Sequence, residues 1–531
     1  MNRRLSRLGV ALMLCYVALF GMLNWVQVLN AEELNDNPIN RRTVEQAYDR
    51  DRGRISTIDG AVVARSTETA EGDRFRYQRE YPEGELFAHT VGWLSFEFGA
   101  EGVEREYNDE LAGLETAQQF TSFEDLFVES DVTGDVQLSL RYDVQQTARA
   151  ALGERAGSVV AVDPRTGAVL AMWSWPSFDP NLLASHDLGS VRDAREALLA
   201  DDGDPLLPKA YRESYAPGST FKIVTAAIGV ENDLVTRDEP VYPVRSEYVP
   251  ALTSVGLGNF GGAACGGALF EIIRASCNTA FAEMGAETIG PDLMIEGAQR
   301  YGFGDQVPVD LPAAAASSFP DSFGAVLEGD GGPGSVVEDT PGLAQASFGQ
   351  GSATAVPLHL ALVAGSMGTG GEVMRPYVVE RIFNADGEVI DEASPEVWRQ
   401  PVSASTAELI RESMIFNATS GTATGMQVAG FEVGGKTGTA EVSTDPLTTH
   451  AWIVGFGGPP GEEPTVAVSV IVEADEAAGQ QTGGRTAAPI AQAVLQQALQ
   501  PFEPVQVTPE SSGEGSTTSS TAPTATTGTG G

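Results

Sequence analysis

Hydrophobic and polar positions divide this chain into four segments of different character. A largely apolar run extends from Leu8 to Val28, and a polar, arginine-rich segment follows it to about Thr133. From Asp135 the apolar runs become dense and periodic, whereas the residues from Glu503 onward are mostly Ser, Thr, Gly and Pro without an apolar period. The pattern predicts a leading helix, a small pedestal domain, a large core-forming domain and a disordered tail. The predicted boundaries are 1–30, 31–134, 135–502 and 503–531.

The leading run is long enough to cross a membrane as a helix. A span needs about 20 apolar residues, and three arginines (Arg3, Arg4 and Arg7) precede the run while acidic residues follow it. This order of charges keeps the N-terminus in the cytoplasm and the rest of the chain outside. A cleaved signal peptide is the alternative, but the run is long for one and Leu29-Asn30-Ala31 is a poor cleavage site. We therefore expect a single-pass anchor in the cell membrane.

The segment from 135 to 502 combines strand-like and helix-like patterns. Short apolar runs bounded by turn residues predict strands near both of its ends. The middle, from about Leu182 to Gln345, has helical periodicity interrupted by Gly- and Pro-rich loops. We expect an α+β fold, with helices flanking an antiparallel sheet and a helical subdomain between its strands. The predicted strands are Ser158–Asp163, Ala168–Ser174, Gly435–Glu441, Ala451–Phe456 and Thr465–Val472, and the predicted terminal helix is Ala488–Leu499.

Charge and composition narrow the range of partners. The 531 residues include 32 Lys and Arg against 73 Asp and Glu, a formal net charge of −41. A surface of this kind repels phosphates, which argues against nucleic acid partners. Lysine occurs only as Lys209, Lys222 and Lys436. Because arginine does not release its proton in proteins, a position that keeps lysine is a candidate for an amine that must be compact or must deprotonate.

The first candidate motif is Ser219-Thr220-Phe221-Lys222, which follows Pro217-Gly218 and predicts a turn that opens a helix. Lys222 would then lie one turn from Ser219 on the same face. A serine hydroxyl is a weak nucleophile until a base removes its proton, and a neutral amine can be that base. The amine is neutral only if burial or a nearby cation lowers its pKa from about 10.4. Alone, a motif of this length is a weak signal.

Two further motifs follow at larger spacing. Ser276-Cys277-Asn278 places a hydroxyl and a carboxamide two residues apart, although a simple turn or helix cap would explain it equally well. Lys436-Thr437-Gly438-Thr439 lies in a β-rich segment and combines a cation, two hydroxyls and a glycine, which suits a carboxylate. The order S-x-x-K, S-x-N and K-T-G, with gaps of about 50 and about 160 residues, is a strong signal when taken together.

The cysteines and histidines give less evidence about function than these motifs do. Cys15 lies in the apolar run, which leaves Cys265 and Cys277 in the exported part. Two cysteines outside the cytoplasm can form a disulfide over so short a loop, or can remain two small apolar side chains. The four histidines match no metal-ligand spacing, so we expect structural roles for them and no metal site. They are His89, His186, His359 and His450.

With these motifs, the exported chain apart from the tail resembles the class B penicillin-binding proteins, most closely the actinobacterial penicillin-binding protein A group. The resemblance implies a pedestal followed by a transpeptidase domain with the fold shared by penicillin-binding proteins and serine β-lactamases. It also implies a D-Ala-D-Ala peptidoglycan donor, an amine acceptor, covalent inhibition by β-lactams, no cofactor, and a disulfide between Cys265 and Cys277. Further supporting stretches are Arg52-Gly53-Arg54-Ile55, Glu101-Gly102-Val103-Glu104, Ser177-Phe178-Asp179-Pro180-Asn181, Ala440-Glu441 and His450-Ala451-Trp452.

The resemblance also implies a role for each motif residue. Ser219 attacks the penultimate D-Ala carbonyl, Lys222 is its base, and Ser276 and Lys436 transfer protons for the departing and arriving amines. The remaining residues bind the donor: Asn278 holds the stem peptide, Thr437 and Thr439 hold its terminal carboxylate, and Gly438 allows the ligand close to the strand. The backbone N–H groups of Ser219 and Thr439 form the oxyanion hole.

One departure from the family pattern concerns Lys209. Pro208-Lys209-Ala210 stands where an Asn-Arg-Ala-like run is expected, and we interpret Lys209 as an ordinary surface or loop cation outside the site.

Three alternative functions share these motifs. A β-lactamase would be shorter and secreted, without an anchor or a pedestal. A D,D-carboxypeptidase would use the same residues with water as acceptor. A catalytically silent scaffold or sensor could recruit partners of division or elongation, although a sensor needs more cytoplasmic sequence than the few residues before the run. The resemblance of the pedestal favours the transpeptidase.

Overall fold

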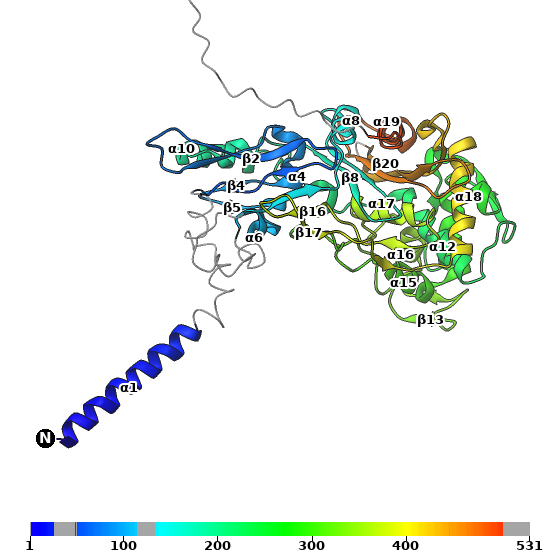
Figure 1. Ribbon diagram of the computed structural model, residues 1–531. Coiled ribbons are helices and arrows are strands. Elements are labelled where there is room, and N and C mark those ends of the chain that lie inside the picture. Colours follow the sequence, from blue (N-terminus) through cyan, green and yellow to red (C-terminus); the bar gives the residue numbers. More distant parts are fainter. Residues whose placement is uncertain (1, 26–47, 49, 114–132, 445–446, 503–531) are drawn as a thin grey trace, which may run out of the picture.

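The computed structural model describes residues 2–25, 48, 50–113, 133–444 and 447–502 (Figure 1). The first helix is α1 (Asn2–Asn24). Within the described residues, no helix is both long enough and apolar enough to cross a membrane. The predicted span Leu8–Val28 continues past Trp25, so its last residues lie outside the described part, as does the predicted tail 503–531.

A five-stranded antiparallel sheet is the centre of the larger domain. Its strand order is β19-β20-β21-β7-β8, so the first hairpin of the domain pairs with its last strand. The predicted hairpin is confirmed, since Val159 pairs with Trp173 across it. The strands are β7 (Gly157–Val162), β8 (Val169–Trp175), β19 (Glu432–Thr444), β20 (Leu447–Gly458) and β21 (Val466–Val472). The predicted α+β character is confirmed.

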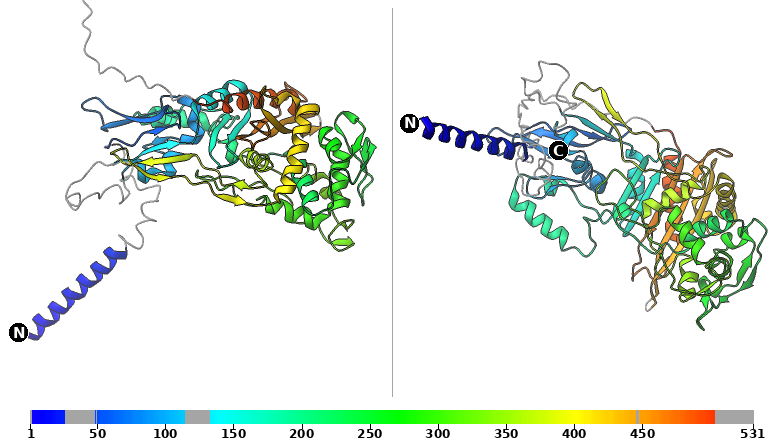
Figure 2. Two further views of the ribbon diagram at one scale, coloured as in Figure 1. Left: turned by 45° about the vertical axis from the view of Figure 1, so that its right-hand side comes forward. Right: turned by 90° about the horizontal axis from the view of Figure 1, so that it is seen from below.

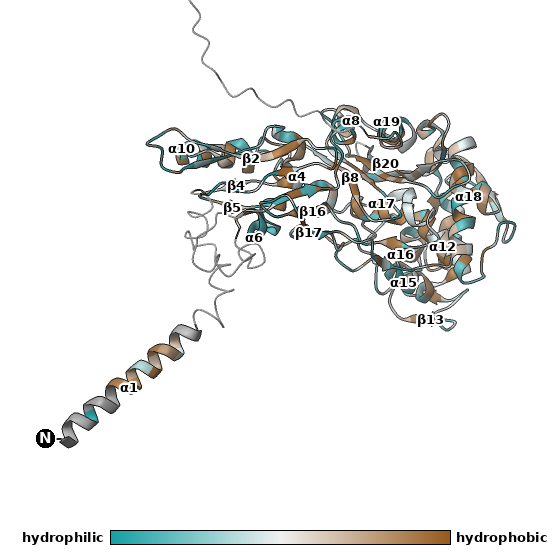
Figure 3. Cartoon of the chain, in the orientation of Figure 1, coloured by the Kyte–Doolittle hydropathy of each residue, from teal (hydrophilic) through white to brown (hydrophobic). Residues whose placement is uncertain are grey.

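Helices cover both faces of this sheet. The helices α8 (Tyr142–Leu152) and α19 (Ala488–Ala498) pack together on one face, and α17 (Pro357–Ser366) packs on the other. All residues of α17 and of β21 are buried. A strand buried on both faces favours apolar residues at successive positions, which explains why every residue of β21 except Ser469 is apolar. Figure 3 shows hydrophobic residues along the strands that these helices cover.

A helical subdomain lies at the end of the molecule away from the pedestal (Figure 2). Its longest helix, α18, runs from Ala404 to Ser420 and packs against both β19 and α12. The other helices are α12 (Lys222–Glu231), α13 (Leu269–Arg274), α14 (Asn278–Glu283), α15 (Pro291–Arg300) and α16 (Thr340–Ala346). The subdomain therefore brings the residues after Ser219 and around Ser276 against the edge strand β19.

The pedestal is built on a second, six-stranded sheet of order β17-β16-β6-β1-β2-β3. Three of its strands, β6, β16 and β17, come from the far side of the predicted boundary at 134/135, and β16 and β17 are far from the others in the sequence, so the sheet joins distant parts of the chain. That boundary stays a prediction. The strands are β1 (Ile55–Ser56), β2 (Val62–Glu68), β3 (Tyr77–Glu80), β6 (Asp135–Leu138), β16 (Val379–Phe383) and β17 (Val389–Glu392).

A buried ion triad holds the pedestal together. Glu104 is fully buried and accepts hydrogen bonds from Arg52 Nε at 2.7 Å and Arg79 Nε at 2.6 Å. Burial raises the pKa of Glu104, but the guanidinium groups of Arg79 and Arg52 outweigh this effect and leave the pKa lowered. Paired cations compensate for burying this carboxylate, and the triad brings together Arg52-Gly53-Arg54-Ile55 and Glu101-Gly102-Val103-Glu104, two stretches that support the resemblance.

Shorter elements complete the fold. The short strands are β4 (Leu94–Ser95), β5 (Gly99–Ala100), β9 (Tyr242–Arg245), β10 (Glu247–Tyr248), β11 (Leu257–Gly258), β12 (Cys265–Gly267), β13 (Val326–Glu328), β14 (Val336–Val337), β15 (Val373–Met374) and β18 (Val397–Arg399). The remaining helices are η2 (Gly84–Phe87), α4 (Ala88–Val91), α5 (Val103–Glu106), α6 (Asn108–Leu111), α9 (Asn181–Ala184), α10 (Leu188–Leu199), α11 (Lys209–Arg212), η4 (Gly218–Phe221), η5 (Phe260–Gly262), η6 (Met284–Ile289), η7 (Thr424–Met426) and η8 (Gly483–Ala487).

Candidate active site

Ser219 lies in the tight turn η4, which leads directly into helix α12. The backbone of this turn is fixed on both sides. Gly218 N donates to Gly349 O at 2.8 Å, and Trp452 Nε1 donates to Ala216 O at 3.1 Å. Ser219 is partly exposed, whereas its neighbours Gly218 and Thr220 are buried. The turn therefore presents the serine at the surface of a rigid support, as expected for a nucleophile.

The turn before Ser219 lies in direct backbone contact with strand β19. Gly218 has φ +54°, and a Cβ there would lie 2.7 Å from Thr439 O. A Cβ at Gly438 would lie 2.9 Å from Pro217 O and 2.8 Å from Trp452 Cβ. The sequence interpretation assigned Gly438 to close approach of a ligand. The structure gives a different reason, because the protein itself occupies that space.

Lys222 is buried behind the serine. Its Nζ donates to Ser276 O at 2.7 Å and to Asn278 Oδ1 at 2.6 Å, and it lies 5.5 Å from the ring centre of Phe281. Burial, and then the charge of Lys436, hold the pKa of Lys222 well below its usual value. A neutral amine has two N–H groups, which match these two acceptors. Its lone pair is then left to accept a proton.

Lys436 also contacts Ser276, and it is fully buried. Its Nζ donates to Ser276 Oγ at 2.7 Å and to Thr437 O at 2.8 Å. Burial lowers the pKa of Lys436 to about 7. Ser276 Oγ is also 3.4 Å from Lys222 Nζ, so one hydroxyl stands between two amines whose charges are both disfavoured. This arrangement permits a proton to pass between the amines through Ser276.

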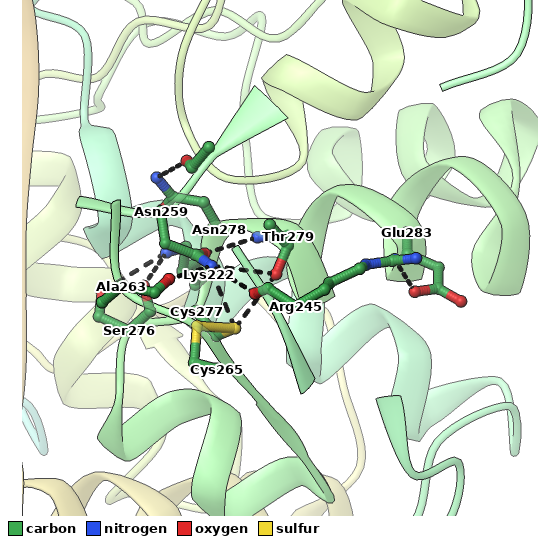
Figure 4. Close-up of a disulfide and its surroundings, with 11 residues drawn as sticks. Lys222, Arg245, Asn259, Ala263, Cys265, Ser276, Cys277, Asn278, Thr279 and Glu283 are labelled. Atoms are coloured by element: carbon green, nitrogen blue, oxygen red, sulfur yellow. Dashed lines mark hydrogen bonds and ion pairs between the residues drawn. A yellow bond between two sulfur atoms is a disulfide. The ribbon is translucent and has the colours of Figure 1, made fainter. Parts of the chain in front are cut away.

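The loop that carries Ser276 and Asn278 is held in an unusual conformation (Figure 4). Ser276 has φ +55°, a region that non-glycine residues rarely adopt and that is found at functional sites. A disulfide joins Cys265 to Cys277, with the Cα atoms 5.8 Å apart. Asn259 adds a second support. Its Oδ1 accepts from Thr279 N at 3.0 Å, and its Nδ2 donates to the carbonyls of Arg245 and Ala263.

The two threonines of the third motif differ in their surroundings. Thr437 is buried, and its hydroxyl donates to Thr422 Oγ1 at 2.6 Å. Thr422 in turn is held by Asn417, whose Oδ1 accepts from Thr422 N at 3.0 Å. Thr439 is partly exposed and lies beside Ser219 through the Gly218 contact. The open face of the site thus displays Ser219, Thr439, Ser276 and Asn278, while the two amines lie beneath.

Lys209 is not the surface cation that the sequence suggested. Its side chain is only 8% exposed, and Nζ donates to Glu473 Oε1 at 2.7 Å. The interpretation was wrong because the partner lies 264 residues away, so local sequence gave no sign of it. Sequence reasoning missed Glu473 and Asn259 for the same reason: each is a common polar residue whose contacts are set by the fold.

Other features lie apart from this constellation. Within the described residues, no group of His, Cys, Asp and Glu is arranged to hold a metal ion. A cavity of about 200 Å³ lies beside Tyr107, Asp310 and β16, and no motif residue lines it. A well-formed cavity is the default location for a ligand site, but here the chemistry is concentrated elsewhere. We therefore assign the site to Ser219 and the motif residues around it, on the basis of their chemistry.

A serine turn at a helix start, two buried amines sharing one hydroxyl and a K-T-G strand at the sheet edge define an active-serine acyl-transfer site. Comparison with known proteins gives the family. The penicillin-binding protein transpeptidase domain matches residues 157–496, and the penicillin-binding protein A dimerisation domain matches residues 52–136. The chain belongs to the penicillin-binding protein transpeptidase family, which confirms the predicted resemblance.

Individual relatives span nearly the whole chain. Peptidoglycan D,D-transpeptidase PbpA of Mycolicibacterium smegmatis is 37% identical over 94% of this chain and 99% of its own length. The protein of the same name from Mycobacterium tuberculosis is 34% identical over 94% of this chain and 99% of its own. The solved structure of penicillin-binding protein A from M. tuberculosis as a ceftriaxone acyl-enzyme complex has a TM-score of 0.76 and 32% identity. It covers 86% of this chain and 100% of that one.

The contact between Gly218 and strand β19 leads to a test. A Gly218→Ala substitution places a Cβ 2.7 Å from Thr439 O, so the turn must move away from the strand. A displacement of about 1 Å at a reacting group costs roughly 100-fold in rate. We expect the rate of acylation by a fluorescent penicillin to fall about 100-fold, measured per folded molecule.

Gly153→Ala is the matched control. Gly153 has φ +63°, close to that of Gly218, but no atom lies within 4 Å of its Cβ position. It therefore incurs the same backbone cost, about 1–2 kcal/mol, without moving the turn. Equal acylation rates in the two variants would contradict the assigned contact.

Proposed function

We propose that this protein is a class B penicillin-binding protein, a serine D,D-transpeptidase that cross-links peptidoglycan stem peptides and is acylated by β-lactams. The observation that carries the proposal is the pair of buried amines, Lys222 and Lys436, that meet at Ser276, together with the partly exposed Ser219 one turn before Lys222. The relatives named as D,D-transpeptidases and the acyl-enzyme structures support it. The donor is a D-Ala-D-Ala stem peptide and the acceptor is an amine of a second stem peptide.

The first half of the reaction uses Lys222. The neutral amine removes the proton of Ser219 Oγ, and the oxygen attacks the carbonyl carbon of the penultimate D-Ala. The tetrahedral oxyanion is stabilised by the backbone N–H groups of Ser219 and Thr439, and loss of one such donor typically costs ~3 kcal/mol. The terminal D-Ala leaves as its amine takes up a proton, which Ser276 delivers from the amines beneath it. An acyl-serine remains.

The second half reverses these steps with a new amine. The acceptor amine attacks the acyl carbon and gives up a proton through Ser276 to the neutral Lys222. Lys222 then returns this proton to Ser219 Oγ as the bond between that oxygen and the acyl carbon breaks, so the serine hydroxyl is restored. The side chain of Asn278 is held in place, since its Nδ2 donates to Gly258 O and its Oδ1 accepts from Lys222 Nζ. The second N–H of Nδ2 can then donate to the donor peptide. Because β19 is the edge strand of its sheet, an extended peptide can pair with it. Thr437, Gly438 and Thr439 would then lie along the donor, with the threonines at its terminal carboxylate.

Labelling with a fluorescent penicillin tests the acyl-serine chemistry. Wild-type protein is expected to form a stable covalent label, and Ser219→Ala none. Lys222→Arg keeps the charge but cannot act as a base, so its labelling should be at least about 100-fold slower, which is the lower end of the usual contribution of general base catalysis. An unlabelled wild type would contradict the proposed enzyme function and favour a silent scaffold. A label lost within seconds would indicate a β-lactamase.

The two lowered pKa values predict a bell-shaped dependence of acylation on pH. Acylation requires neutral Lys222, so the rate falls as pH drops through its lowered pKa. Lys436 loses its charge above about pH 7, which weakens attraction for the anionic carboxylate and lowers the rate on the alkaline side. Lys436→Arg stays charged, so its profile should lack the alkaline decline, while its maximal rate should be lower because an arginine cannot pass a proton to Ser276. The measurement is the second-order acylation rate constant from pH 5 to 10, and an alkaline decline unchanged in Lys436→Arg would contradict the assignment.

We further propose that residues 1–30 anchor the protein in the cell membrane as a single pass, with the catalytic domain outside, where division or elongation partners work. The apolar run and the preceding arginines support this. Replacing Leu14 and Leu19 together by arginine should release the full chain into the carbonate-soluble fraction, whereas wild type stays with membranes. Replacing Leu182 and Leu199, two exposed leucines of the folded part, is the matched control. Retention of the first variant would refute the anchor.

A further inference from the structure

A buried ion pair lies beside the nucleophile turn and has no place in the chemistry above. Lys209 Nζ donates to Glu473 Oε1 at 2.7 Å, and the two side chains are 8% and 20% exposed. Lys209 belongs to α11, ten residues before Ser219, and Glu473 directly follows β21. The pair therefore connects the segment that leads into the serine with the central sheet.

The same carboxylate oxygen accepts a second hydrogen bond. Tyr215 Oη donates to Glu473 Oε1 at 2.8 Å, and Tyr215 is four residues before Ser219. Burial, and then the charge of Glu473, raise the pKa of Tyr215, so the phenol stays protonated and donates at every physiological pH. The backbone of Tyr215 is also fixed, because it exchanges hydrogen bonds with Ala355 at 3.0 and 2.8 Å.

The backbone of Glu473 is held by hydrogen bonds at both its N–H and its carbonyl. Its N–H donates to Ala156 O at 2.8 Å, and its carbonyl accepts from Gln481 Nε2 at 3.0 Å. The ring of Tyr215 also packs edge-on against two residues of β20, His450 at 5.4 Å and Trp452 at 6.0 Å. Trp452 in turn holds Ala216 O. The tyrosine is thus fixed at its ring by β20, at its hydroxyl by Glu473 directly after β21, and at its backbone by Ala355 just before α17.

We propose that Glu473, with its charge balanced by Lys209, is a positioning residue that sets the location of Tyr215 and hence of the Ser219 turn relative to strand β19. The inference rests on the proposed role of Ser219 as nucleophile. Glu473 itself touches no reacting atom. Its carboxylate ties Tyr215, which precedes the turn, to the end of β21. The distance between the serine and the oxyanion donors therefore stays constant.

Lysine suits this position for a geometric reason. Its ammonium is a compact point charge that can share one carboxylate oxygen with the tyrosine, whereas an arginine prefers to contact both oxygens. Lys209→Arg preserves the charge balance, and Lys209→Met removes it. An isolated buried ion pair often contributes little to stability, so a role in positioning is tested by the acylation rate and not by the melting temperature.

The experiment separates binding from chemistry in the full-length protein. Saturation kinetics with a fluorescent penicillin give the dissociation constant of the first complex and the acylation rate constant, and end-point labelling counts active sites. We expect Tyr215→Phe, Glu473→Gln and Lys209→Met each to lower the acylation rate constant about 10-fold to 100-fold, with the dissociation constant unchanged. Lys209→Arg should restore the rate only in part, to about 3-fold to 10-fold below wild type, since it keeps the charge balance of Glu473 but competes with Tyr215 for the shared carboxylate oxygen.

Tyr107→Phe is the matched control, because Tyr107 Oη donates to the buried carboxylate of Asp310 at 2.8 Å in a region apart from Ser219. It should acylate at the wild-type rate. Wild-type acylation in Tyr215→Phe would overturn the inference, and so would an equal decrease in Tyr107→Phe. Label retained by Ser219→Ala would instead refute the proposed nucleophile, so the two failures are distinguishable.

Discussion

The backbone contact between the nucleophile turn and strand β19 is the constraint on which the rest of the site depends. Neither Gly218 nor Gly438 has room for a Cβ, so the two segments lie as close as polypeptide backbones can. This contact joins two elements from distant parts of the sequence, the start of α12 and the edge of the sheet. Catalysis by oxyanion stabilisation requires donors placed before the reaction begins. The fold meets that requirement by fixing the turn through Trp452 and Gly349 and leaving only Ser219 partly exposed.

Beneath this contact the dominant effect is electrostatic. Two amines are buried on either side of Ser276 Oγ, and burial is the leading cause of the lowered pKa in both Lys222 and Lys436. Near neutral pH, the charged and neutral forms of each lysine amine therefore differ less in free energy than they would in water. A proton can then move between Lys222 and Lys436 at moderate pH. The cost of burying them is offset by the acceptors at hydrogen-bond distance, chiefly Ser276 O and Thr437 O. Burial makes Lys222 a base, and it also makes the charge of Lys436 change with pH near neutrality.

The sequence was sufficient to predict the α+β fold, the first hairpin and the three motifs, because each is local or is marked by rare residues. Because the chain has only three lysines, the positions of Lys222 and Lys436 in the motifs marked them as candidate site residues. The assigned roles stay predictions, although the structure places Lys222 within hydrogen-bond distance of Ser276 and Asn278, and Lys436 within hydrogen-bond distance of Ser276. What could not be predicted depends on contacts between distant residues. Examples are the Lys209–Glu473 pair, the support of Asn259 and the addition of β16 and β17 to the pedestal sheet.

That addition has a structural consequence for the two domains. Strand β16 pairs with β6, so a segment from the middle of the larger domain completes the pedestal sheet. Asp310 reinforces the junction, since its carboxylate accepts from Val378 N, Val379 N and Tyr107 Oη at 2.7, 3.0 and 2.8 Å. Burial raises the pKa of Asp310, and three donors compensate for removing this carboxylate from water. A hinge at residue 134 alone therefore cannot separate the pedestal from the catalytic domain, because β16 and Tyr107 would have to detach as well. The pedestal supports the catalytic domain through a shared sheet, not through a single linker.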